Sequence, residues 1–398
     1  MLRKYLKNNH RKVKGKENIC IKLNAGILPA VLVICVLMLL ALFAVYMIWS
    51  GESLFVAGIH YRMAQYANME SACVVYRNDS TFIRRLEGNQ EYRLYPEDRS
   101  SVVRLTAGLW GLYEIITLKG EKETPVSYRL LGNMRHSEYD CNFYYPDNHT
   151  AVIIAGNTAI NGEMRLPASG IRSGQIRSEF FSGTPIDERK VKPGGRTLPP
   201  PLERSAGHIK SLFEDTGHIL HLKGEKEFAG NNIEELDHLP DDALVIARKI
   251  TVKENAVIKG QLFATDTILV RSGAVLQYPS GIFLAGDNPG RYVEIEEGCT
   301  INGYVIVDGN GKSDINYPNY KQSPGSEIRG MVYINGIAIL HGCIKGPVFL
   351  QRAVFYSDYG YYDNTIYNAV IEENDNPAFP LWLNSRYGKK EIKWLEKE

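Results

Sequence analysis

The feature of this sequence that most constrains its fold is a short motif that recurs at a fixed interval. Residues 250–258 reappear as 268–276, an offset of 18 residues at every position, and a third copy follows at 293–301. Each copy alternates apolar and polar residues, turns at an asparagine or glycine, and starts a new short strand. Such a period is typical of a β-solenoid, in which each coil stacks on the previous one. The repeat predicts a parallel β-helix, with an ordinary β-sandwich as the alternative.

The predicted solenoid extends beyond the three copies. The extra residues before the third copy are expected to form a surface loop around 286–290. Glycines spaced by six, eight and four residues mark successive turns, so 150–185 is predicted to form coils or lead into them. We assign the solenoid to 146–375, with a proline-rich insertion at about 190–204 that favours an extended connector. The turn glycines are Gly156, Gly162, Gly170 and Gly174.

A solenoid has two open ends that need cover. Residues 206–245 and the tail 376–398 are the segments predicted to cover them. Within the tail, residues 391–395 are predicted to form a short amphipathic cap helix.

A long apolar stretch lies near the N-terminus. No charged residue occurs from Ala25 to Trp49, and these 25 residues would span roughly 37 Å as a helix, enough to cross a bilayer with some tilt. We predict a transmembrane helix at 25–49. The alternative is a cleaved secretory signal, whose apolar region is shorter, about 7–15 residues, and ends in small residues. This stretch instead ends in Tyr46 to Trp49.

The positive charge of the chain is concentrated before this stretch. Residues 1–22 hold eight lysines and arginines against Glu17 alone, whereas the whole chain has a net charge of +1. A basic arm ahead of an apolar span sets membrane orientation, so residues 1–24 are predicted to be cytoplasmic and residues 50–398 exported. This interpretation needs no nucleic-acid partner, and none is predicted.

Two further segments precede the solenoid. Residues 50–77 are predicted to be a stalk helix, because Leu54, Ile59 and Met63 fall at approximate helical spacing. This apolar face should be buried against the chain's own β module or against a partner. Residues 78–145 contain short strands rich in β-branched and aromatic residues, which predict a small α+β module. The predicted fold class is therefore mainly β, with an N-terminal helix, a small α+β module and a parallel β-helix.

No complete catalytic or metal-binding motif occurs in the sequence. Residues 308–314 resemble a phosphate loop at Gly311-Lys312-Ser313, but position 306 is Ile306 where that loop needs glycine. Calcium binding by this segment and a plain polar turn remain the alternatives. The nine histidines form no HExxH motif, and residues 170–174 place serine one position away from a nucleophile elbow. Carboxylates are available for glycoside hydrolysis, but surface carboxylates are expected in any case. They are Glu294, Glu296, Asp308 and Asp314.

The cysteines give no metal or redox motif. On the predicted topology four of the six are exported, and no two lie close enough in sequence to form a CxxC pair. They are interpreted as buried small side chains, with one disulfide as the alternative. The four are Cys73, Cys141, Cys299 and Cys343. We therefore predict no catalytic residues, no cofactor-binding residues and no metal ligands, and no enzymatic activity.

Three resemblances support this layout. Ala25-Gly26 and the apolar run after them resemble the front of type IV pilins and pseudopilins, although Val31 stands where that family has glutamate. The period and texture of 250–371 are similar to bactofilins, which form cytoplasmic polymers, so a cytoskeletal role is not implied here. Residues 110–114 and 156–162, among others, resemble an uncharacterised family of bacterial single-pass envelope proteins. These resemblances imply a location and an architecture, not an activity.

The predicted function is that of a non-enzymatic component of the bacterial envelope, anchored in the inner membrane with a periplasmic β-helix. It would act as a pseudopilin-like or secretion-associated scaffold, with envelope proteins or further copies of itself as partners. The alternative is a membrane-tethered β-helix that binds or cleaves polysaccharide. A group of tyrosines and aspartates able to contact sugar rings motivates it. They are Tyr356, Tyr359, Tyr361, Tyr362, Tyr367, Asp358 and Asp363.

Overall fold

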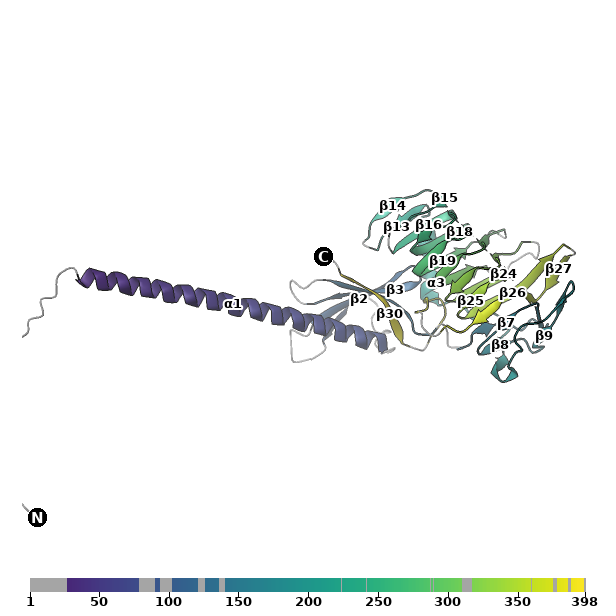
Figure 1. Ribbon diagram of the computed structural model, residues 1–398, viewed down its shortest axis with the longest axis horizontal. Helices are drawn as coiled ribbons and strands as arrows, with labels where there is room; N and C mark the ends of the chain where they lie inside the picture. Colours follow the sequence, from purple (N-terminus) through teal and green to yellow (C-terminus); the bar gives the residue numbers. More distant parts are fainter. Residues whose placement is uncertain are drawn as a thin grey trace, which may run out of the picture. The chain divides into compact units, whose positions relative to one another are not determined.

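The computed structural model shows a mainly β protein with one long N-terminal helix (Figure 1). The chain divides into two units, residues 1–64 and residues 65–398. The basic arm predicted at 1–24 lies outside the described residues. The structure describes residues 27–78, 90–93, 102–120, 126–135, 140–222, 224–240, 242–286, 288, 290–309, 317–358, 360–374, 378–385 and 388–396.

Helix α1 (Ile27–Asn78) is 52 residues long and includes the predicted stalk without a break. Among the described residues it is the one helix long and apolar enough to cross a membrane. Its residues from Ile27 to Trp49 are apolar on every side and exposed, and such a surface needs lipid or a protein core around it. Length and composition therefore fit a membrane span, and a secretory signal would satisfy the same criteria.

The C-terminal end of α1 packs on a five-stranded antiparallel sheet. The sheet order is β1 (Gln90–Arg93), β2 (Val102–Trp110), β3 (Tyr113–Lys119), β4 (Ser127–Asn133) and β30 (Lys389–Glu396). Met69, Cys73 and Tyr76 of α1 are buried against apolar side chains of this sheet. Helix and sheet thus share one core, which has the α+β organisation expected from the sequence.

Strand β30 corrects the prediction of a cap helix at 391–395. These residues are extended and pair antiparallel with β4, with Glu391 opposite Leu131 and Leu395 opposite Tyr128. The free edge of β4 offers backbone hydrogen bonds that a helix would leave unused, so tertiary pairing overrides the local helical pattern.

Buried ion pairs hold this strand in place. Lys389 donates to the fully buried carboxylate of Glu114 on β3, which also accepts a 3.1 Å bond from Arg204. The Lys389 amine lies 4.9 Å from the ring centre of Tyr76, so it contacts α1 as well. Burial lowers the pKa of Lys389, and Glu114 opposes that effect. The C-terminal strand is therefore joined to α1 and to β3 through one buried charge.

The rest of the chain forms a barrel-like set of mainly parallel strands, stacked one on another (Figure 1). Pairing follows the sequence repeat: Ile250 pairs with Ile268 and Ile268 with Val293, offsets of 18 and 25 residues. The strands of this stack that follow residue 242 are β16 (Ala243–Val252), β17 (Val257–Ile258), β18 (Gly260–Val270), β19 (Val275–Ala285), β20 (Tyr292–Ile295), β21 (Thr300–Asp308), β22 (Tyr320–Gln322), β23 (Glu327–Arg329), β24 (Val332–Ile339), β25 (Cys343–Lys345), β26 (Val348–Ser357) and β29 (Val370–Glu372).

The order of strands in the stack differs from their order in the sequence. After β26 and β29 the next strands are β5 (Phe143–Tyr144) and β7 (Ala159–Ile160), which come from far earlier in the chain. Strand β28 (Thr365–Tyr367) likewise pairs with β6 (Val152–Ala155). The stack then continues from β5 to β8 (Met164–Leu166) and from β8 to β12 (Val191–Pro193). Strand β6 also pairs with β9 (Ile171–Ser173), so that β28, β6 and β9 form a three-stranded sheet. Residues 143–193 therefore extend the stack beyond its C-terminal strands.

The opposite end of the stack is formed by residues 218–236. Strands β13 (His218–Leu220) and β15 (Asn232–Leu236) both pair with β16, and β14 (Lys226–Phe228) pairs with β13. The segment predicted to cover an end, 206–245, thus does so in its central part. The tail 376–398 does not, because its described part packs along the side of the stack and in the sheet of β30.

Alternate residues of the stacked strands point to two different cores. In β19, Ile282 and Leu284 face the interior, whereas Phe283 faces outward. The outward side chains form an apolar face on one side of the stack, and α3 (Glu203–Phe213) and Trp382 cover it. Uninterrupted apolar runs such as 304–307 follow from this, because strands buried on both faces need no polar alternation. We call this the outer apolar face, and its members include Phe263, Phe283, Tyr304, Tyr333 and Phe349.

Glycines form one corner of the stack. Gly303, Gly330 and Gly346 have φ angles of 155°, 153° and 143°. A Cβ on Gly330 would lie 1.6 Å from the carbonyl oxygen of Gly303, and one on Gly346 would lie 2.3 Å from that of Gly330. Successive segments of the stack approach so closely at this corner that a side chain cannot fit.

We expect Gly330→Ala to destabilise the protein by about 3 kcal/mol, because it combines an unfavourable φ with a backbone clash. Gly207→Ala is the control: it lies in α3 with open space around it, and should be neutral or stabilising by about 0.5–1 kcal/mol. Urea unfolding of the full chain, followed by tryptophan fluorescence, measures both. Equal effects from the two substitutions would contradict the proposed packing of this corner.

Candidate functional site

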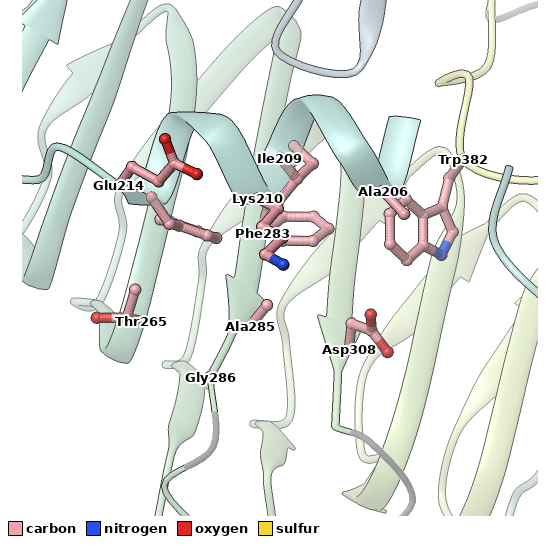
Figure 2. A pocket seen from close by; sticks show the side chains of 11 residues that line it. Ala206, Ile209, Lys210, Glu214, Thr265, Phe283, Ala285, Gly286, Asp308 and Trp382 are labelled. Atoms are coloured by element: carbon pink, nitrogen blue, oxygen red, sulfur yellow. The ribbon is translucent and has the colours of Figure 1, made fainter. Parts of the chain in front are cut away.

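A groove of about 690 Å³ lies between α3 and the stacked strands (Figure 2). Ala206, Ile209 and Phe213 of α3 line one wall. The amine of Lys210 and the carboxylate of Asp308 face this space from different elements, the helix and the end of β21. The groove follows from the outer apolar face, because an eleven-residue helix covers only part of it.

Aromatic side chains line the bottom of the groove. The Phe283 ring contacts the rings of Trp382 and Phe213, with centroid distances of 5.2 Å and 6.1 Å. Phe283 and Trp382 are fully buried, so they form the floor and present no face for a ligand to stack on. The rim is polar, with Lys210 and Glu214 exposed. A ligand here would meet an apolar base and groups able to form hydrogen bonds.

Of the predicted carboxylates, the groove has Asp308 among its described lining residues. Its described lining residues include no histidine, cysteine or serine. Asp308, one of the predicted carboxylates, accepts a 3.1 Å hydrogen bond from Asn335. Asn310 and Asp314, which the calcium alternative requires, lie outside the described residues. Among the residues that the structure does describe, no three histidine, cysteine or acidic side chains are grouped to hold a metal.

The other two predicted carboxylates are engaged in cross-strand ion pairs. Lys321 donates to Glu294 at 2.7 Å, and Arg271 donates to Glu296 at 2.5 Å. The pKa of Glu296 is lowered: burial alone would raise it, but the bonds from Arg271 and Ser272 outweigh that effect. A carboxylate held ionised in this way stabilises neighbouring strands and is unsuited to act as a general acid.

The structure brings most of the predicted tyrosines together. Tyr362 and Tyr367 each contact Phe355, with centroid distances of 6.1 Å and 4.6 Å, and His341 contacts Tyr367 at 5.5 Å. We call His341, Phe355, Tyr362 and Tyr367 the aromatic cluster. Each of these side chains is only partly buried, so the cluster presents ring edges and faces to solvent.

Two hairpins border the aromatic cluster. In the first, β26 pairs with β27 (Gly360–Asp363), which places Tyr356 opposite Tyr361 with ring centres 6.4 Å apart. The second is formed by β10 (Gln175–Ile176) and β11 (Glu179–Phe180). The Tyr367 hydroxyl donates to Glu179, and this bond, assisted by burial, raises the pKa of Tyr367.

Charged side chains around the aromatic cluster are paired with one another. Arg177 and Asp358 form an ion pair at 2.6 Å, which joins the two hairpins. Arg352 forms two bonds to Asp363, at 2.7 Å and 2.6 Å. Because these charges compensate each other, the surface offers hydrogen-bonding groups without a large net charge.

Sequence reasoning found only part of this cluster. It missed His341, Phe355 and Glu179, and Tyr359 lies outside the described residues. Glu179 lies 188 residues from Tyr367, and no local pattern links them. The contact exists because residues 143–193 stack next to the C-terminal strands. This order of strands is decided by the tertiary structure.

The cysteines behave as buried side chains. Cys73, Cys141 and Cys299 are buried, Cys343 is partly buried, and no disulfide joins these four. Burial raises the pKa of Cys73 from 9.0 to about 11 and that of Cys141 to about 12. Thiols with so little thiolate at neutral pH are poor nucleophiles, so neither Cys73 nor Cys141 suits a catalytic role.

Comparison of the chain with protein-family models, with curated proteins and with solved structures gives no match.

We expect a water-soluble maleimide to label Cys343 first among these four cysteines in the folded protein at pH 8. Cys73 should react about a hundredfold or more slowly than in urea, because its raised pKa makes the thiolate about a hundredfold scarcer and burial blocks access. Peptide mass spectrometry reports each cysteine separately. Labelling of Cys73 at the rate of Cys343, or a disulfide-linked peptide, would contradict the structure.

Proposed function

We propose that this protein is a non-enzymatic component of the bacterial cell envelope, anchored in the inner membrane by α1. The β-rich body would be a β-solenoid that presents a rigid surface for protein contact. One observation carries this proposal: α1 exposes apolar side chains well beyond the length that a membrane span requires.

The length of α1 supports this interpretation. A helix of 52 residues extends about 78 Å, whereas the hydrocarbon core of a bilayer is about 30 Å thick. Beyond Trp49 the helix still exposes Leu54, Phe55, Ile59 and Met63, and Leu54 is 74% exposed. Apolar side chains on a segment outside the bilayer favour contact with another protein, most simply with other helices.

The pairing of the strands supports the solenoid. The 18- and 25-residue offsets between paired strands equal the offsets of the sequence repeat, as expected when each coil rests on the preceding one. Strands of successive coils align their apolar residues, for example Leu276 with Ile301 and Ile301 with Ile328. Such a body is held by contacts between neighbouring coils and suits a scaffold.

The proposed orientation rests on the basic arm. Eight lysines and arginines before the apolar span favour a cytoplasmic N-terminus and a periplasmic body. The pseudopilin-like start of the helix agrees with an assembly role in which anchor helices pack together. A scaffold also agrees with the buried cysteines and the paired carboxylates described above.

Replacing Ile59 and Met63 together with aspartate should release the protein from its complex, because two charges on the exposed helix face would oppose helix packing. Crosslinking in native cells, gentle solubilisation and mass spectrometry would measure the co-recovered partners, with a loss of roughly tenfold expected. His60→Asp is the matched control on the same turn and should leave recovery unchanged. Equal recovery with the double variant would argue against an assembly role of this helix.

Binding of polysaccharide by the aromatic cluster is a second candidate function. Partly exposed rings can stack on pyranose faces, and adjacent carboxylates and hydroxyls can bond sugar hydroxyls. The compensated charges of Arg177, Asp358, Arg352 and Asp363 favour an uncharged glycan. Tyr361, which is 54% exposed, is the most accessible of the tyrosines that the structure describes at this site.

We expect the Tyr361→Ala, Tyr362→Ala double variant to weaken retention on neutral glycans at least tenfold, because stacking area is lost. A glycan array probed with the full chain in detergent measures this. Tyr317→Ala, which removes an exposed ring elsewhere, is the control. If the unmodified chain retains no glycan, this second function is ruled out. Shortened sugars among retained glycans would instead indicate cleavage.

A further inference from the structure

The two ends of the strand stack carry unpaired strand edges. At one end β15 pairs only with β16 and β14 only with β13 among the described strands. At the other end β12 pairs only with β8, and β9 only with β6. Free strand edges are places where a second chain can add. We call residues 224–240 the acidic end and residues 172–196 the basic end.

The acidic end has an excess of exposed carboxylates. Residues 224–240 contain five acidic side chains against one lysine, a net charge of −4, and all six are exposed. Among the described residues, three of these carboxylates form no ion pair, namely Glu225, Glu234 and Glu235. Glu234 and Glu235 lie on the edge strand β15 itself.

The basic end has the opposite charge. Residues 172–196 contain six lysines and arginines against three acids, a net charge of +3, and all six basic side chains are exposed. Three of them form no ion pair within the described chain, namely Arg172, Lys190 and Arg196. Arg172 lies on β9, and Lys190 immediately precedes the edge strand β12.

We propose that the acidic end of one copy docks on the basic end of a second copy. The two ends are different surfaces, so the contact is heterologous and its repetition gives an open linear assembly. Three unpaired carboxylates on one end match three unpaired basic side chains on the other. Each end also exposes a phenylalanine beside its charges, Phe228 at the acidic end and Phe180 at the basic end, which would add apolar contact.

Charged edge strands also serve to prevent unwanted pairing. Charge of either sign would serve that purpose. If both ends had the same sign, every pairing of two ends would be repulsive. Opposite signs block only the pairing of like ends and leave the head-to-tail contact attractive. This arrangement therefore selects one geometry of self-association. The inference rests on residues 172–240 and not on the membrane role proposed above.

Two charge-reversed variants of the full chain in detergent test the contact. Glu234→Lys with Glu235→Lys neutralises the acidic end, and Arg172→Glu with Lys190→Glu changes the basic end from +3 to −1. Analytical ultracentrifugation should show self-association of the unmodified chain that weakens at least tenfold from 50 to 500 mM salt, where the Debye length falls to about 4 Å. Each variant alone should associate at least tenfold more weakly than the unmodified chain.

Mixing the two variants gives the decisive result. The first keeps its basic end and the second its acidic end, so the mixture should form one-to-one pairs and no longer assemblies. Glu297→Lys, which reverses an exposed carboxylate on a turn within the stack, should assemble like the unmodified chain. Association through α1 would persist in both variants and at high salt. A monomeric unmodified chain, or association unaffected by the reversals, would overturn the proposal.

Discussion

Burial of both faces of the strands on one side of the stack is the constraint on which the rest of this structure depends. Parallel strands pack well only when both of their faces are covered. The inner face is closed by the stack itself, whereas the outer apolar face needs other parts of the chain. Helix α3 and the segment around Trp382 meet that need, and the groove lies where the cover ends. The position of the groove is thus a consequence of packing.

The same constraint explains the path of the chain. Residues 143–193 add strands at one end of the stack, and the chain must then return to the other end before residue 243. It makes this return along the outer apolar face, so that α3 is both connector and cover. The tail returns to the small sheet, where Lys389 is buried against Glu114. Removing one member of such a buried pair would leave an uncompensated buried charge, which is strongly destabilising. The pair therefore holds the tail on the small sheet that packs against α1.

The proposed functions of this protein depend on its exposed surfaces. Glu294 and Glu296 are paired across strands, and the thiols of Cys73 and Cys141 are buried with raised pKa values. What remains exposed is a long apolar helix, an aromatic cluster bordered by compensated charges, and two ends of opposite charge. Each of these suits recognition of another molecule.

The sequence alone determined two kinds of element: the uniformly apolar helix and the strands that recur with the 18-residue repeat. The apolar run before Trp49 and the 18-residue repeat are local patterns, and the observed helix and strand pairing agree with them. Turns predicted at Gly156, Gly162 and Gly170 were also recognisable, because each of these glycines has a positive φ that other residues rarely adopt.

Only the tertiary structure decided which distant segments meet. The stacking of Phe143 on Val348, the strand at 389–396 and the bond from Tyr367 to Glu179 join residues far apart in the chain. The periodicity of the sequence does not predict such contacts. They are stabilised because one segment fills a free strand edge or covers an apolar face that a distant segment provides. The sequence therefore predicted the repeating unit, whereas packing decided the order of the units and the surfaces they create.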